Sequence, residues 1–232
     1  MHDIEYILKR NKRLTGNINL RVKNGQVHIS APFWISKKII DDFVTSKKDW
    51  IIAALDKQKT KAAVKDYKEG DKHLFFGEQK TLIVTKTDSI TRTSLVNESE
   101  NFVLTIYKGY TDTDYYLHAQ RAFLSFYLEQ LIAYLTDRVN YYSEQLGVEY
   151  SKIEVKKVSS IWGSCSAKNV LSFNRKLCLA PKEIVDYVVI HEVCHLRERN
   201  HSSRFWGLVR THDKNYKQNR HWLHQNHELL NI

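Results

Sequence analysis

Helical periodicity dominates the middle of the chain, between residues 114 and 146. Apolar or aromatic side chains return at spacings of three and four residues, and only Arg121 interrupts the series at positions 117, 121, 124, 128, 131, 135, 139, 142 and 146. This spacing places them on one face of an α-helix. Gly147 follows directly, and glycine is a common residue at a helix C-terminus. The chain must therefore fold around one long amphipathic helix.

The segments on both sides of this helix predict strands mixed with further helices. Asn24-Gly25 lies at the centre of alternating apolar residues between 17 and 30, which is typical of a β-hairpin. Residues 36–55 have helical spacing, with Ser36 as the candidate N-cap. We expect strands at 72–86, 101–108, 152–158 and 169–179, an irregular connection at 88–100, and a second helix that begins at Pro181. The fold class is therefore α+β.

Composition favours a globular protein of a reducing compartment. The 232 residues are 42% hydrophobic, which is enough for a substantial core. No apolar run reaches the roughly 18–20 residues of a membrane span, and the N-terminal segment lacks the apolar core of a secretory signal. Cys165, Cys178 and Cys194 are too few for a disulfide framework. We expect a cytoplasmic location and no membrane partner.

The net charge of +10 is unevenly distributed along the chain. Residues 1–110 hold 20 Lys/Arg against 13 Asp/Glu, whereas residues 111–232 hold 16 against 13. This asymmetry and the change of pattern divide the chain into an N-terminal basic α+β region, 1–110, and a second region, 111–232. A basic region attracts nucleic acid or an acidic partner, although lysines that alternate with acids are also typical of an ordinary solvated surface. Weak nucleic-acid association through the N-terminal region is therefore an open alternative.

The residues with the clearest chemistry are in the predicted helix after Pro181. His191 and His195 are four residues apart, so both imidazoles project from one helix face and can chelate one ion. Glu192 adjoins them. A carboxylate beside zinc ligands can take a proton from water, whose pKa the metal lowers to about 7. This pattern predicts a zinc-dependent hydrolase with Glu192 as its general base.

A catalytic zinc ion usually takes three protein ligands, so one more is needed. His201 follows His195 by six residues, too far to share its helical face but near enough to return if the helix ends between them. Asn200 is a candidate for the left-handed residue of that reversal. We therefore expect His191, His195 and His201 to bind Zn²⁺. The other reading is a histidine-rich C-terminal segment without metal, since residues 212, 221, 224 and 227 are also histidine.

The sequence resembles the YgjP-like metallopeptidase family, which is described together with the SprT-like and WLM-type peptidases. The resemblance rests on Trp162–Cys165, on Leu171–Leu177 with Asn174, on Pro181 and Asp186–Val189, and on His191–Trp206. Residues 17–55 resemble the N-terminal region of the family, so the resemblance covers nearly the whole chain.

This resemblance implies a zincin-like metallopeptidase domain at 111–232. In such a domain a His-Glu-x-x-His helix lies beside a small sheet whose edge strand can take an extended peptide. The N-terminal hairpin, helix and strands would precede it. The family implies Zn²⁺ on His191, His195 and His201, activation of water by Glu192, and a peptide or protein substrate. The physiological substrate does not follow from the resemblance.

Several assignments stay open. Some deformylase-type hydrolases pair the same helical motif with an upstream cysteine ligand, so Cys165 is an alternative third ligand. The same metal chemistry would also hydrolyse a formyl or acyl amide. Tyr187 and Arg175 are candidates for the donor that stabilises the oxyanion.

Neighbours of the ligands carry further expectations. Glu198 either orients a ligand histidine or is an exposed charge. Phe205 and Trp206 are expected to pin the segment that follows His201 against the helix. The loop around Trp162 either forms a wall of the substrate cleft or anchors itself in the core.

Overall fold

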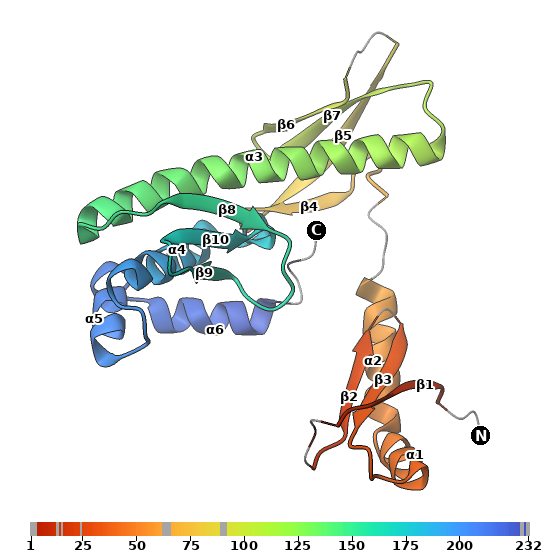
Figure 1. Cartoon of the computed structure of the whole chain (residues 1–232). Coiled ribbons are helices and arrows are strands. Elements are labelled where there is room, and N and C mark those ends of the chain that lie inside the picture. Colours follow the sequence, from red (N-terminus) through yellow and green to blue (C-terminus); the bar gives the residue numbers. More distant parts are fainter. Residues whose placement is uncertain are drawn as a thin grey trace. The chain divides into compact units, whose positions relative to one another are not determined.

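The computed structural model describes residues 4–12, 14, 16–23, 25–61, 66–88, 92–227 and 230. Within these residues the fold is mixed α+β, with six α-helices, one 3₁₀ helix and three small sheets. They form two compact units, residues 1–65 and residues 66–232 (Figure 1). Across the described ranges, no helix has the length and apolar character needed to cross a membrane.

The first unit is a three-stranded sheet with two helices. Strands β1 (Tyr6–Arg10), β2 (Asn19–Lys23) and β3 (Gln26–Ala31) pair in the order β1-β3-β2, and β2 and β3 form the predicted antiparallel hairpin. Gly25 takes the left-handed conformation in its turn (φ 71°), while Asn24 lies outside the described residues. Ser36 caps the expected helix, which the structure divides at Lys47 into α1 (Lys37–Ser46) and α2 (Lys48–Lys61). Ile29, Ile40 and Ile51 are fully buried in the core of this unit.

The second unit begins with a four-stranded sheet. Its strands β4 (Lys72–Phe75), β5 (Glu78–Thr87), β6 (Ser94–Glu98) and β7 (Asn101–Tyr107) pair in the order β4-β5-β7-β6. The strand expected at 72–86 is two strands, because Phe76 and Gly77 both have positive φ and reverse the chain. The segment 88–100, expected to be irregular, contains β6. Its pairing with β7 comes from contacts across the sheet, which local composition does not encode.

Helix α3 (Asp112–Leu146) is the long helix that the periodicity predicts, with Thr111 as its N-cap and left-handed Gly147 as its C-cap. Its buried stripe differs from the expected one in the first half, where Leu117 is 40% exposed. From Ala119 to Val139 the buried residues return every four positions, namely Ala119, Phe123, Tyr127, Leu131, Leu135 and Val139, so the observed and expected stripes coincide from Leu131 onward. A four-residue step turns the stripe by about 40° around a helix of about 100° per residue. The stripe winds because α3 packs both on β6 and β7 and on α4. Figure 1 shows the four-stranded sheet beside the N-terminal half of α3.

The second half of this unit holds a smaller sheet and three helices. Strands β8 (Lys152–Lys156), β9 (Gly163–Cys165) and β10 (Val170–Asn174) pair in the order β8-β10-β9, which makes β9 an edge strand. The strand expected at 169–179 ends at Asn174, because its side chain accepts a hydrogen bond from the Lys176 amide and begins the 3₁₀ helix η1 (Arg175–Leu179). Helices α4 (Lys182–Arg197), α5 (Ser203–His212) and α6 (Tyr216–Asn226) follow.

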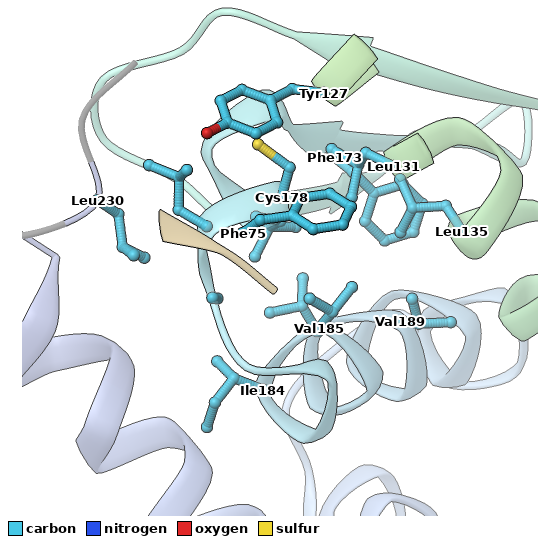
Figure 2. Close-up of a cluster of buried hydrophobic side chains, with 14 of the residues drawn as sticks. Phe75, Tyr127, Leu131, Leu135, Phe173, Cys178, Ile184, Val185, Val189 and Leu230 are labelled. Atoms are coloured by element: carbon cyan, nitrogen blue, oxygen red, sulfur yellow. The ribbon is translucent and has the colours of Figure 1, made fainter. Parts of the chain in front are cut away.

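The division between the units lies at residue 65, whereas the sequence suggested a boundary at 110. The cause is the packing of β4 on the C-terminal elements. The amides of Phe76 and Gly77 donate to the carbonyls of Cys178 and Leu179, at 2.7 and 3.2 Å. Phe75 shares one core with side chains of α3, β10, η1 and α4, among them Tyr127, Leu131, Phe173, Cys178 and Val185 (Figure 2). The strands of residues 72–107 therefore complete the hydrophobic core of the C-terminal region.

Candidate metal centre

Helix α4 carries three of the four predicted site residues. Pro181 is its N-cap, where the missing amide proton costs no helical hydrogen bond. The helix buries Val185, Val189 and Val193 against the core, and this burial fixes its rotation about its axis. His191 and His195 then emerge together on one face.

The three predicted histidines converge. The Nε2 atom of His201 lies 3.0 Å from Nε2 of His191 and 3.2 Å from Nε2 of His195. A tetrahedral zinc ion with Zn–N bonds of about 2.0–2.1 Å separates its ligand nitrogens by about 3.3 Å. The observed nitrogen spacing is within a few tenths of an ångström of this value. The three side chains therefore fit one divalent cation.

The tautomer of His195 is set by the backbone. Its Nδ1 lies 3.0 Å from the carbonyl oxygen of Glu198, which can only accept, so Nδ1 carries the proton. The lone pair is left on Nε2, the atom that faces the other two histidines. Glu198 therefore contacts this predicted ligand through its main-chain carbonyl, whereas the sequence suggested its side-chain carboxylate for that role. A hydrogen bond of this kind fixes ring orientation in metal sites.

The two helical imidazoles are held in the neutral form that binds metals. Burial, followed by the charges of His195 and His201, lowers the pKa of His191 to about 3. Burial also lowers the pKa of His195. Neutral imidazoles keep a lone pair for a cation, so little proton competition is expected at neutral pH.

Aromatic side chains of α5 hold the third histidine in place. The ring of Phe205 stacks on His195 at 4.4 Å, and the ring of Trp206 stacks on His201 at 5.7 Å between centroids. This confirms the expectation for both residues. The chain reversal before His201 differs from the one expected, because Asn200 is not among the residues with positive φ. Instead, its side-chain oxygen accepts from the Ser202 amide, and Ser202 caps α5 through the Phe205 amide.

Glu192 is buried between α4 and the edge strand β9. Only 5% of its surface is exposed, and burial raises the pKa of its carboxyl group to about 8. Gly163 of β9 lies directly against it, because a Cβ added at Gly163 would be 2.6 Å from Oε1 of Glu192. The glycine therefore leaves room for the carboxyl group beside the histidines.

A cavity of about 330 Å³ opens beside the histidine group. It is lined by Ile161, Trp162 and Gly163 from β9 and the segment before it, by Tyr187, Val188, His191 and Glu192 from α4, and by Arg220, Leu223 and His224 from α6. The loop around Trp162 therefore does form a wall of this cavity. The sequence pattern did not identify the α6 residues as part of a site, because this segment stands out in the sequence only as histidine-rich. Their spacing of three and four residues is the signal that places them on one helix face.

Two candidate roles remain, a metal ligand at Cys165 and an oxyanion donor at Tyr187 or Arg175. Cys165 lies in β9, and its Sγ accepts a hydrogen bond from the Arg199 guanidinium at 3.2 Å. In the described part of the chain, the group of possible metal ligands consists of the three histidines and does not include Cys165. Of the oxyanion candidates, Tyr187 lines the cavity with its ring against His191, whereas Arg175 begins η1.

Two polar networks position these elements. Asp186 of α4 accepts from Arg138 through both carboxylate oxygens, at 2.8 and 2.9 Å, and from the Tyr134 hydroxyl at 2.9 Å, which ties α4 to α3. Asn174 is buried and donates to the carbonyls of Val158 and Ile161, at 3.0 and 2.9 Å. It therefore fixes the segment that leads into β9.

Comparison with protein families places the chain in the metallopeptidase class. The model of the "YgjP-like, metallopeptidase domain" family matches residues 16–226, nearly the whole chain. The chain belongs to the YgjP-like family, as its resemblance in sequence suggested. Comparisons with curated proteins and with solved structures gave no significant match.

Proposed function

We propose that this chain is a zinc peptidase in which His191, His195 and His201 hold the metal and Glu192 is the general base. The observation that carries the proposal is the convergence of three Nε2 atoms next to a buried glutamate. The Nε2 atom of His201 lies 3.0 Å from that of His191 and 3.2 Å from that of His195. The family supplies the reaction class, since its members are metallopeptidases.

The chemistry divides between the metal and this chain. A bound Zn²⁺ supplies a Lewis acid that polarises the scissile carbonyl and acidifies water. Glu192 takes the proton from the attacking water and passes it to the leaving nitrogen as the C–N bond breaks. A divalent cation on the adjacent histidines favours the ionised carboxylate, which opposes the effect of burial on the pKa of Glu192.

The edge strand β9 supports an extended substrate. It is one of the two outer strands of its sheet and lies against Glu192, so a peptide that pairs with β9 would pass beside the histidine group. This arrangement favours peptides or unfolded protein segments over compact folded substrates.

The test is metal analysis combined with peptide cleavage. Zinc-loaded protein is expected to cleave a mixed peptide library. Glu192→Gln is expected to keep the metal and lose cleavage, while His201→Ala loses both. His118→Ala, a histidine of α3 stacked on Tyr110, is the matched control and keeps both. Folded protein that binds no zinc would refute the proposal, and cleavage of N-formyl or N-acyl amides alone would assign another amide substrate.

A second candidate function is nucleic-acid binding by the first unit. Residues 1–65 hold 14 Lys/Arg against 6 Asp/Glu, so they carry most of the net charge. Phe33 and Trp34, between β3 and α1, are 66% and 64% exposed, and Lys37 and Lys38 follow them. Exposed aromatic rings beside cations favour single-stranded nucleic acid. Binding by the full chain that falls steeply with salt, and falls again in Phe33→Ala/Trp34→Ala, would support this function, while absent or salt-independent binding would remove it.

A further inference from the structure

The cavity beside the histidine group has an arginine, Arg220, in its lining. Most of its lining is apolar or aromatic, including buried Val188 and Leu223 and the partly buried Trp162. The acid in this lining is Glu192, to which the proposed function gives the role of base. Arg220 contributes its guanidinium group to the same lining from α6. The lining therefore combines an apolar surface with a guanidinium group.

Arg220 is held in place by a stack of rings. Its guanidinium lies over the ring of Trp206 at 5.4 Å, and Trp206 stacks in turn on His201 and on Tyr216. A planar guanidinium on an aromatic face is oriented with its edge donors free. The stack thus connects Arg220 to a predicted metal ligand through one intervening ring.

Arg220 has no carboxylate partner in the described ranges. The ion pairs found there involve Arg138 and several lysines, and Arg220 is not among them. Asp213, at the end of α5, instead accepts from the Asn215 amide and the Asn219 side chain. As far as the described residues extend, the guanidinium thus presents unused donors at a cavity that His191 and Glu192 also line.

We infer that this cavity is a subsite for a substrate carboxylate, which Arg220 binds through paired N–H donors close to the scissile amide. This inference rests on the proposed peptidase function and specifies its substrate class. An arginine–carboxylate pair is bidentate and directional, so it selects a carboxylate over the isosteric amide. The carboxylate comes either from an acidic side chain or from the C-terminus of a peptide, and the two sources are separable by experiment.

The test measures binding without cleavage, in zinc-loaded Glu192→Gln. Three fluorescently labelled peptides of otherwise identical sequence are compared by anisotropy. One has an internal Glu and an amidated C-terminus, one has Gln at that position with the amide, and one has the same Gln with a free C-terminus. We expect one of the two peptides that carry a carboxylate to bind about tenfold or more tightly than the neutral peptide. The peptide that binds more tightly identifies the source of the carboxylate.

The role of Arg220 is then tested by substitution. Arg220→Gln is expected to abolish the preference, and Arg220→Lys to keep only part of it, since an ammonium lacks the paired donors. Lys217→Gln removes a charge from the same helix outside this cavity and is expected to leave the preference intact. Thermal melts check that the variants remain folded, as expected for exposed side chains.

The outcomes separate this inference from the peptidase proposal. Equal binding of all three peptides, no saturable binding of any, or a preference that survives Arg220→Gln overturns the carboxylate subsite. If wild-type zinc protein cleaves the neutral and acidic peptides equally, the peptidase function stands and the subsite fails. If an Arg220-dependent preference is found but wild-type protein cleaves none of the peptides, the subsite stands and the peptidase function fails.

Discussion

Replacement of Gly163 by alanine is the sharpest test of how the fold positions Glu192. The added Cβ would lie 2.6 Å from Oε1, 2.7 Å from Cγ and 2.9 Å from Cδ of Glu192. Ordinary contacts of a Cβ begin at 3.4 Å, so the glutamate side chain and β9 must separate by roughly 0.5–0.8 Å. Gly163 is not among the residues with positive φ, so alanine causes no backbone strain of its own. The perturbation is therefore a displacement of Glu192, the proposed general base.

The expected loss of activity follows from this displacement. A misplacement of about 1 Å in a catalytic group costs about 100-fold in rate, or about 2.7 kcal/mol of transition-state stabilisation. Because three atoms of Glu192 are in conflict, rotation of the carboxyl group alone does not relieve it. We expect kcat/KM for a good peptide substrate to fall by about 30- to 100-fold. Zinc content should not change, because the three nearest atoms to the new methyl group all belong to Glu192.

The assay pairs peptide cleavage with metal analysis on the same preparations. Gly207→Ala is the matched control, because a Cβ at Gly207 meets nothing within 4 Å in the middle of α5. It should keep full activity and gain about 0.5–1 kcal/mol of stability from helix propensity. Full activity of Gly163→Ala would refute the assignment of Glu192 as a base held against β9. Loss of zinc together with activity would show that the substitution damages the whole site.

Three further predictions concern stability. Asp186→Ala removes the carboxylate that accepts from Arg138 and Tyr134, and the ion pair of Asp186 with Arg138 is only about a quarter exposed. The free energy of unfolding, measured with urea, should therefore fall by about 2 kcal/mol. A fall below about 0.5 kcal/mol would contradict the anchoring role. In metal-free protein the raised pKa of Glu192, about 8, means that the folded state retains a proton that the unfolded state releases near pH 4.5. The free energy of unfolding of the wild type therefore falls as pH rises from 4.5 to 8. Glu192→Gln should be more stable than wild type by about 3 kcal/mol at pH 7 but not at pH 4.5. Equal stability of the two proteins at both pH values would refute a buried neutral acid. Zinc at about 100 times its Kd should stabilise the wild type by about 2.7 kcal/mol in thermal melts and leave the stability of His201→Ala nearly unchanged. Equal stabilisation of both proteins would exclude His201 as a ligand.

The parts of the fold that the sequence predicts best are those encoded by short-range patterns. The hairpin around Gly25, the C-terminus of α3 at Gly147 and the helix after Pro181 each depend on neighbours within a few residues. The convergence of the three histidines also follows from local features, namely one helical turn and a short reversal. Trp206 strengthens it, because the aromatic residue that packs on His201 is itself only five residues further along the chain.

The parts that the sequence does not predict depend on distant partners. Strand β9 has only three residues and exists because Gly163, Ser164 and Cys165 pair with β10. Arg220 reaches the cavity only because α6 returns alongside α4, which the spacing within α6 does not reveal.

The position of α4 explains why residues 66–110 belong with the candidate metal centre. Its N-terminus is set by the turn at Phe76-Gly77, where a Cβ on Gly77 would lie 2.8 Å from Cγ of Pro181, so the turn and the N-cap are in direct contact. Its second turn is tied to α3 by the pair of Asp186 with Arg138, and its C-terminal end is covered by Phe205. A rotation of α4 by one residue, about 100°, would remove His191 and His195 from the face that His201 approaches. The strands before α3 therefore act on the candidate metal centre through the packing that fixes this rotation, although none of their described residues belongs to the group of possible ligands.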